Sequence, residues 1–438
     1  YSDQYPMSAP VMDLNYAVCI PSNGAVFGPN QEVRIPFNVP ADCFVDTRRA
    51  YLKYSVNNTT GAVAALDPLC GGAAFFENFR VVSGTGALLE EIIHYNALVS
   101  LVNSNNGVSR NESVVNIMEG GAPAPMNVLV GGEAAGQALA MAGHCTMIDN
   151  ATSVLTHRPV SAIFNADKYL PFGYTQGTAY LSLTLTATAT GVIFNNDAVG
   201  ADNWSLDNFE LHVPVLRPGN EFAQNFRTLL ASGMPINIHS VGFQNSQQNI
   251  AQNTTGAAIL TYSTRKRSVK SLLTIFRINS QITNNLCDSV SCRKNLGIST
   301  YQYSVGGVRI PSAPISCAPS DSSTVMAGND LGALAVNTSL ALGHYDSNLR
   351  GVTANRQFFM ATTDTTLSSR CAFALDLESY GEGLSGKNLS GQGLPLVLHC
   401  QIGAGKAPTI GAILADLYII HDVIFQLDGI SGTLTASS

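Results

Sequence analysis

The sequence predicts an all-β protein made of two tandem β-sandwiches of similar size, with a few short helices. Charged residues make up only 12% of the chain, while Gly alone contributes 39 residues. This composition favours strands joined by turns over helices with many charged side chains. The 438 residues exceed what one hydrophobic core usually supports. Several stretches also alternate apolar and polar residues with the period of a half-buried strand.

The stretch from 208 to 243 predicts the junction between the two sandwiches. Apolar residues alternate up to Val215 and then recur at helical spacing over 221–231, and Gly233 and Pro235 supply helix-end signals before a new strand-like run. We therefore divide the chain into an N-terminal arm with the first sandwich (1–217), a linker helix (218–235) and the second sandwich (236–438). Three apolar side chains of the helix are expected to be buried between the sandwiches: Phe222, Phe226 and Leu229.

In the first half, the strands follow from period-two alternation and the turns from Gly. The polar arm up to about residue 13 has no periodicity. Gly84 and Gly86 mark the loop of a hairpin, and apolar residues at helical spacing follow it. The predicted elements are strands over 32–39, 50–56 and 180–190, a hairpin over 79–91 and a short helix over 92–102.

The second half repeats this organisation without detectable sequence identity. Strands are predicted over 258–263, 269–278, 301–310, 373–377, 394–401 and 415–427. Each half also contains a long Gly- and Ala-rich excursion, 107–149 and 312–355, far longer than an ordinary loop of about 4–6 residues. We expect both excursions to pack against neighbouring subunits or to form a tower at an outer surface.

Charge and composition disfavour several classes of function. The net charge is −7, and no basic cluster exceeds residues 265–267, so the footprint of a nucleic-acid-binding protein is absent. No apolar run approaches the roughly 18–20 residues of a membrane span, and the N-terminal residues lack the order of a signal peptide. The nine scattered cysteines indicate free, mostly buried thiols in a reducing compartment.

The apparent catalytic and ligand-binding motifs are better explained as structural. Residues 381–387 have the Gly and Lys spacing of a phosphate loop, but Asn388 stands where the metal-binding hydroxyl belongs, and no helix is predicted after it. His421 and Asp422 are adjacent on a predicted strand and so face opposite ways, and no nucleophile elbow is present. Cys287 and Cys292 lack a second pair at zinc-site spacing. We expect no catalytic, cofactor-binding or metal-binding residues.

Specific stretches of the second half resemble a known family. Residues 301–315, with Gly306, Pro311 and Pro314, resemble the strand, Gly turn and Pro-x-x-Pro segment of major capsid proteins of polinton-like viruses, virophages and adintoviruses, in the PRD1–adenovirus lineage. Residues 373–379, then Ser385 and Gly386, and then 394–396 are similar to a late segment of the same family. Residues 268–276 resemble a strand of its second jelly roll.

The resemblance implies a double jelly roll, that is, two eight-stranded jelly-roll sandwiches over 1–217 and 236–438 joined by the linker helix. It further implies a homotrimeric, pseudohexameric capsomer in an icosahedral shell around double-stranded DNA, located in the virion and assembled in the host cytoplasm or nucleus. The implied partners are other copies of the chain, neighbouring capsomers, and penton and minor capsid proteins. The implied role involves no catalysis, no cofactor, no membrane span and no sequence-specific nucleic-acid binding.

Two other classes of function stay open. A secreted carbohydrate-binding or adhesive β-sandwich protein would cluster aromatic side chains on a sheet face, and Trp204 is the only Trp. A hydrolase on a β-sandwich would need the paired carboxylates or the triad that the sequence lacks.

Overall fold

The first half of the chain forms a jelly roll. The computed structural model describes residues 11–59, 61, 63–67, 69–104, 146–147, 150–186, 192–195, 204–282, 290, 293–317, 331–346, 371–378, 384–391, 395–403 and 412–438. The strands of the first half are β1 (Val11–Cys19), β2 (Val26–Phe27), β3 (Glu32–Pro36), β4 (Phe44–Val45), β5 (Tyr51–Asn58), β6 (Ala64–Leu66), β7 (Phe76–Val82), β8 (Leu88–Ile93), β9 (Thr146–Met147), β10 (Thr152–His157), β11 (Tyr180–Leu185), β12 (Ile193–Asn195) and β13 (Trp204–Pro218). Its helices are η1 (Thr47–Arg49), η2 (Gly71–Phe75), α1 (Tyr95–Ser104), η4 (Ile163–Asn165) and η5 (Phe172–Tyr174).

The sheet order of the first half identifies the topology. One sheet has the order β1-β13-β5-β10, with β2 and β4 also paired to β13, and the other has the order β3-β11-β7-β8. Numbered along the chain, these eight principal strands follow the orders 1-8-3-6 and 2-7-4-5. Two antiparallel four-stranded sheets connected in this way form a jelly roll.

The second half has the same topology. Its strands are β14 (Ile236–Ile250), β15 (Gly256–Tyr262), β16 (Val269–Ile278), β17 (Thr300–Val305), β18 (Val308–Ser316), β19 (Phe373–Asp376), β20 (Leu396–Ile402), β21 (Ile413–Leu427) and β22 (Leu434–Ser437). The sheets β14-β21-β16-β19 and β15-β20-β17-β18 again give the orders 1-8-3-6 and 2-7-4-5. Helix α4 (Asn220–Ala231) joins the two jelly rolls, and α5 (Asn279–Ile282) and α6 (Gly332–Gly343) belong to the second. The prediction of a duplicated all-β architecture is confirmed.

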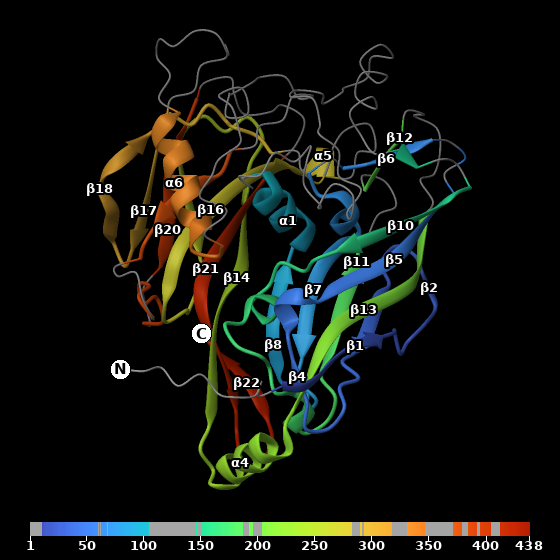
Figure 1. Ribbon diagram of the computed structural model, residues 1–438. Coiled ribbons are helices and arrows are strands. Elements are labelled where there is room, and N and C mark those ends of the chain that lie inside the picture. The colour runs from blue at the N-terminus through green and yellow to red at the C-terminus, as the bar shows by residue number, and fades with distance from the viewer. Residues whose placement is uncertain are drawn as a thin grey trace.

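The β14-β21-β16-β19 sheet is buried on both faces. Every residue of β16 is buried. Leu272 and Phe276 belong to the core of the second jelly roll, whereas Leu273 and Ile275, on the opposite face, join the core of the first. That second face packs against β8 and η4, so the sheets follow one another across the molecule from β17 and β18 on one flank to β1 and β13 on the other (Figure 1).

Several predicted elements need correction. The helix predicted over 92–102 begins at Tyr95, because residues up to Ile93 pair with β7 in a hairpin. The excursion 312–355 is not one loop, since β18 continues to Ser316 and α6 forms within it. Nearly all of 107–149 lies outside the described residues.

Candidate assembly interface

The linker helix α4 does not supply the buried contact between the jelly rolls. Phe222 and Leu229 are 46% and 39% exposed, and Leu230 is the only buried residue of the helix. The prediction that Phe222 and Leu229 are buried between the sandwiches is therefore wrong, and Phe226 is half-buried.

The position of α4 at one end of the molecule explains this exposure. The helix caps the end of both jelly rolls (Figure 1), and its aromatic side chains contact the first one only at its margin. The Phe226 ring lies 5.0 Å from the Phe44 ring and 4.7 Å from the Tyr174 ring, edge to face, and Phe222 lies 6.0 Å from Phe44. Helical spacing of apolar residues predicted the helix, but not how far the chain would cover its apolar side.

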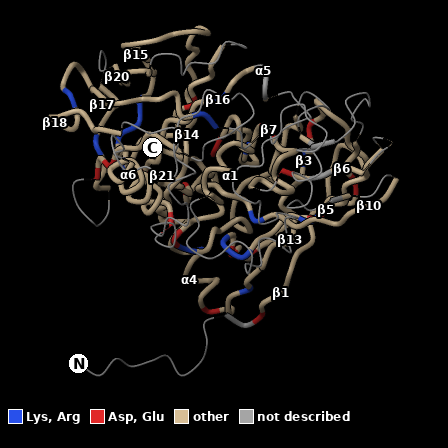
Figure 2. Tube along the Cα trace, turned by 90° about the horizontal axis from the view of Figure 1, so that it is seen from above, with Lys and Arg blue, Asp and Glu red and all other residues tan. Residues whose placement is uncertain are grey.

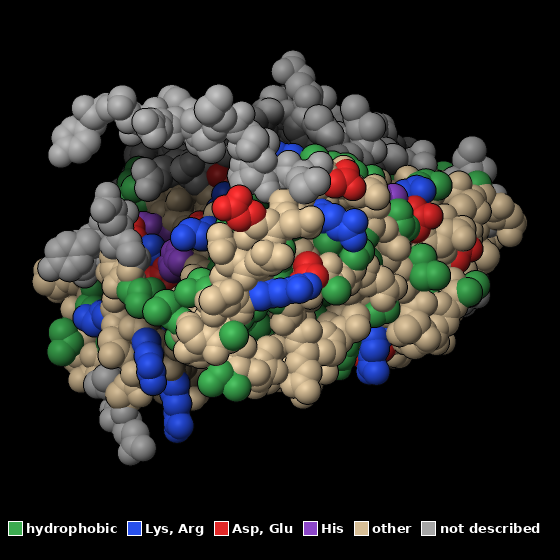
Figure 3. Space-filling model, turned by 60° about the horizontal axis from the view of Figure 1, so that its bottom comes forward, with side chains coloured by type: hydrophobic (Ala, Val, Ile, Leu, Met, Phe, Trp, Pro, Cys, Tyr) green, Lys and Arg blue, Asp and Glu red, His purple; other side chains and the backbone are tan. Residues whose placement is uncertain are grey.

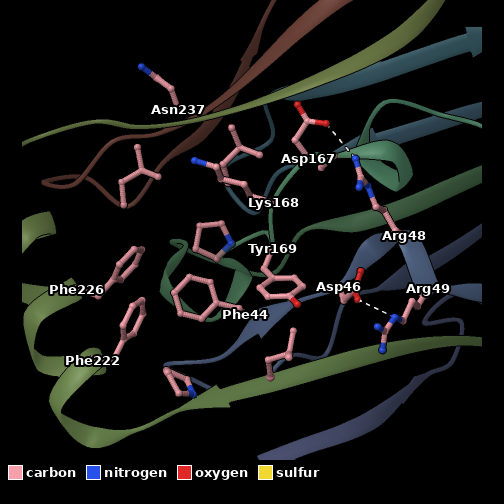
Figure 4. Close-up of a pocket in the computed structure, with 16 residues that line it drawn as sticks. Phe44, Asp46, Arg48, Arg49, Asp167, Lys168, Tyr169, Phe222, Phe226 and Asn237 are labelled. Atoms are coloured by element: carbon pink, nitrogen blue, oxygen red, sulfur yellow. Dashed lines mark hydrogen bonds and ion pairs between the residues drawn. The ribbon is translucent and has the colours of Figure 1, made fainter. Parts of the chain in front are cut away.

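The helix forms one wall of a pocket of about 690 Å³. The pocket is lined by Phe44, Asp46, Arg48, Arg49, Ala166, Asp167, Lys168, Tyr169, Pro171, Leu216, Pro218, Phe222, Phe226, Ile236, Asn237 and Ile238. The ion pairs Arg48–Asp167 (3.0 Å) and Arg49–Asp46 (3.3 Å) lie on one side and the Phe222 and Phe226 rings on the other (Figure 4). Apolar and basic side chains also share the bottom face of the molecule (Figure 3).

A polar network joins the jelly rolls beside this pocket. The two ring nitrogens of His239, on β14, contact Asp167 of the first jelly roll and Asp422 of the second. Asp422 also accepts a hydrogen bond from the Ser268 hydroxyl and lies 3.5 Å from the Lys270 ammonium. These hydrogen bonds and charges lower the pKa of Asp422 despite its burial.

The network continues within the second jelly roll. Lys270 pairs with Glu378 at 2.8 Å, and the two ring nitrogens of His344 contact Glu378 and Asp376, each at 2.8 Å. His344 and Asp422, the neighbour of His421 in the sequence, thus belong to one charge network. His421 is buried on the other side of the strand, as the alternation of β21 required.

A second polar cluster, near α1, crosses the contact between the two jelly rolls. Arg277, which is 1% exposed, pairs with the buried Asp416 at 2.6 Å and contacts Nδ1 of His94 at 2.8 Å. Burial, and then the nearby guanidinium, lowers the pKa of His94, although Glu77 lies 3.0 Å from the same ring nitrogen. The Tyr418 hydroxyl donates to the His94 carbonyl at 2.9 Å. The contacts of Arg277 and Tyr418 with His94 thus cross from the second jelly roll to the first and help to fix how the two are aligned.

The residues that resemble the capsid-protein segments occupy structural positions and do not form one site. Gly306 and Gly307 have φ of 57° and 84°, the conformation that a two-residue hairpin between β17 and β18 requires. The side-chain amide of Gln302 donates to the Pro311 carbonyl at 2.6 Å, and Pro314 is exposed on the edge strand β18.

Ser385 and Gly386 lie together in a second place, at the charge network. The Ser385 hydroxyl donates to Glu378 at 2.5 Å, and the Gly386 amide donates to the Ser268 hydroxyl at 3.1 Å. Lys387 then pairs with Val269 through backbone hydrogen bonds of 2.7 and 2.9 Å. The loop therefore attaches to β16, and its described part lacks the helix N-terminus that a phosphate loop needs.

The described residues add three observations. The six cysteines among them, Cys19, Cys43, Cys70, Cys317, Cys371 and Cys400, are free and buried. In the part of the chain that the structure describes, no group of three or more His, Cys, Asp or Glu side chains is arranged to hold a metal ion. No helix in the described ranges is long and apolar enough to cross a membrane.

Sequence reasoning missed strand β1 and the His239 network. Strand β1 could have been predicted from the alternation of Leu14, Tyr16 and Val18, which has the same period as the later strands. The His239 contacts carried no local signal, because Asp167 and Asp422 are distant in the sequence.

Comparison with solved structures identifies the fold. No protein-family model and no curated protein sequence matches the chain. A crystal structure of PBCV-1 VP54, fitted into a cryo-EM reconstruction of the virophage Sputnik, matches with a TM-score of 0.61 and 10% identity over 98% of both chains. The Faustovirus major capsid protein matches with a TM-score of 0.54 and 10% identity over 96% of this chain and 92% of that one. The mavirus major capsid protein matches with a TM-score of 0.50 and 8% identity over 100% of this chain and 92% of that one.

These matches and the strand orders define the class. The chain is a double jelly-roll protein, and solved structures with this fold include major capsid proteins of viruses. Each match spans both jelly rolls, so the likeness extends to the tandem arrangement and not to one sandwich alone.

Proposed function

We propose that this chain is a major capsid protein that forms homotrimeric, pseudohexameric capsomers of an icosahedral shell around double-stranded DNA. The observation that carries the proposal is the tandem pair of jelly rolls of identical strand order, matched along nearly its whole length by viral major capsid proteins. Three copies around a three-fold axis present six similar sandwiches, so one kind of chain can tile a hexagonal lattice.

The sparse charge supports extensive contact with other copies. Lys, Arg, Asp and Glu are few and scattered along the described chain (Figure 2), as suits a surface that other protein covers. The proposal includes the division into 1–217, 218–235 and 236–438, a structural role without enzymatic activity, penton and minor capsid partners, and assembly in the host cytoplasm or nucleus.

The alternative of a secreted carbohydrate-binding or adhesive protein has less support. Such a protein needs aromatic side chains on an exposed sheet face, and Trp204 is 3% exposed and packs edge to face on Phe75 at 4.9 Å. That Trp belongs to the core.

Light scattering on the purified protein tests the proposal. We expect a mass about three times the 46.2 kDa of the chain, with larger shells visible by electron microscopy, because obligate interfaces commonly leave no stable monomer. A folded monomer whose mass is independent of concentration would contradict the proposal and favour the adhesive alternative.

A further inference from the structure

A second pocket lies at the contact between the two jelly rolls. Its volume is about 330 Å³, at the lower end of the range of about 300–1,000 Å³ that is usual for ligand pockets, which often lie between domains. Strand β8 of the first jelly roll lines one side, and β14, β21 and β22 of the second line the other (Figure 1). The lining residues are Leu88, Leu89, Glu90, Glu91, Ile93, Phe243, Gln244, Asn245, Lys266, His421, Val423, Ala436 and Ser438.

Part of this lining is apolar. Leu89, Phe243 and Val423 are buried and come from three different strands, β8, β14 and β21. Leu88 and Ile93 of β8 are exposed, so the apolar lining continues to the molecular surface. The pocket can therefore hold a short apolar chain.

Four ionisable side chains line the same pocket, and their charges do not balance. Glu91 pairs with Arg80 at 2.6 Å. Burial raises the pKa of Glu90 to about 7, although its carboxyl accepts hydrogen bonds from two backbone amides. Burial, and then the charge of Lys266, lowers the pKa of His421 to about 3, so its ring is neutral. At pH 6 the Lys266 ammonium is therefore the one unbalanced charge of the lining.

Two hydrogen-bond donors of the pocket have unused capacity. The Lys266 ammonium donates to the Ser438 hydroxyl at 2.6 Å and forms no ion pair with any residue that the structure describes, whereas an ammonium group has three donors. Nδ2 of Asn245 is buried and has no hydrogen-bond partner in the described part of the chain. Burial also lowers the pKa of Lys266, because its charge has lost part of its solvation. An anionic oxygen would satisfy both donors and restore what the ammonium lacks.

We propose that this pocket binds a small organic carboxylate that carries a short apolar chain. The carboxylate accepts hydrogen bonds from Lys266 and Asn245. The chain packs against Leu89, Phe243 and Val423. Such a ligand contacts both jelly rolls at once, so its binding stabilises their alignment. The inference goes beyond the proposed function and does not depend on it.

Hexanoate at pH 6 tests the site. We expect saturable binding to the wild-type protein by isothermal titration calorimetry, and a melting temperature that rises with hexanoate concentration. Hexanamide has the same chain without the charge, and it should bind about tenfold more weakly or less, because hydrogen bonds to charged groups are the stronger ones. Absence of hexanoate binding at millimolar concentration, or equal binding of hexanamide, would overturn the inference.

A lysine substitution tests the proposed contact with the carboxylate. Lys266→Met removes the ammonium and should weaken hexanoate binding by about tenfold or more. Arg265→Met is the matched control, because this neighbouring side chain is exposed and does not line the pocket, yet its loss changes the net charge equally. The control should bind hexanoate as the wild type does. An equal loss in both variants would show a general effect of charge and would refute the site.

Filling the pocket tests its location without removing either donor. Ala436 is a half-buried lining residue, and Ala436→Leu should abolish hexanoate binding while the circular dichroism spectrum stays unchanged. This variant decides the question even if Lys266→Met does not fold. Wild-type affinity in Ala436→Leu would place the binding elsewhere and contradict the inference. The mass by light scattering tests the proposed function separately, since a monomer and a trimer both contain the whole pocket.

Discussion

Asp167 of the first jelly roll and His239 of the second are joined by a hydrogen bond of 2.7 Å to Nδ1 of the imidazole ring. Nε2 of the same ring contacts Asp422 at 2.8 Å. Both partners are carboxylates, and only a doubly protonated imidazolium can donate from both nitrogens. The hydrogen bond with Asp422, and then that with Asp167, raises the pKa of His239. The ring is therefore a cation that bridges the two jelly rolls.

This bridge predicts a loss of stability as the pH rises above about 6.5. Because the pKa of His239 is higher in the folded chain than its unfolded value of about 6.5, its contribution is complete below pH 6.5 and disappears as the pH rises through the raised pKa. Two basic side chains lie beside the bridge: Arg48 pairs with Asp167 at 3.0 Å, and Lys270 lies 3.5 Å from Asp422. His239→Gln should flatten this part of the profile of unfolding free energy against pH, as measured by urea denaturation. An unchanged slope would contradict the cationic bridge.

Glu90 predicts a second pH dependence at lower pH. Burial raises the pKa of its carboxyl to about 7, although it accepts hydrogen bonds from the amides of Ala162 and Ile163. The folded chain therefore holds this proton up to about pH 7 while the unfolded chain releases it near 4.5, so stability falls as the pH rises between these values, by about 3 kcal/mol. Glu90→Gln should remove this slope in urea denaturation. A variant that keeps the wild-type profile from pH 4.5 to 7 would show that another group causes it.

The close packing around Gly386 predicts that no larger residue fits at this position beside the charge network. A Cβ atom there would lie 2.6 Å from backbone atoms of Ser268 and Val269, which cannot move without disturbing β16. We expect Gly386→Ala to lower the unfolding free energy by about 1–3 kcal/mol. Gly332→Ala is the control, since nothing lies within 4 Å of the added atom at the start of α6, and it should be neutral or stabilising by up to about 1 kcal/mol. Equal effects of the two substitutions would contradict the close contact.

The cysteines predict slow alkylation of the native protein. The six described ones are free and buried, and burial raises the pKa of Cys400 to about 12, which suppresses the reactive thiolate. Denaturation without a reductant should then expose most of the nine thiols to iodoacetamide, counted by mass spectrometry. Labelling of a single thiol would indicate four disulfides and an oxidising compartment.

The sequence locates a strand that is buried on both faces, but it does not show what covers each face. The prediction of 269–278 matches β16 (Val269–Ile278), and the alternation from 208 to Val215 lies within β13 (Trp204–Pro218). In β16, Leu272 and Leu273 are consecutive and both buried, because each faces a different core. The apolar content of the run therefore located the strand but gave no sign that it separates two cores.

The contacts between the jelly rolls could not be predicted for a different reason. Asp167 and His239 are separated by 72 residues and His239 and Asp422 by 183, so no local spacing joins them. For α4 the apolar spacing predicted the helix but not its surroundings, because the exposure of Phe222 depends on which part of the fold lies over it.

Because the β14-β21-β16-β19 sheet is buried on both faces, the stability of each half of the chain depends on the other. If the chain were cut at the linker helix, Leu273, Ile275 and Tyr418 would face water, since the first jelly roll is what covers them. Neither half is then an autonomous folding unit, and heat or denaturant should melt both in one cooperative transition. The two jelly rolls share one strand order, but they cannot separate without exposing their common core.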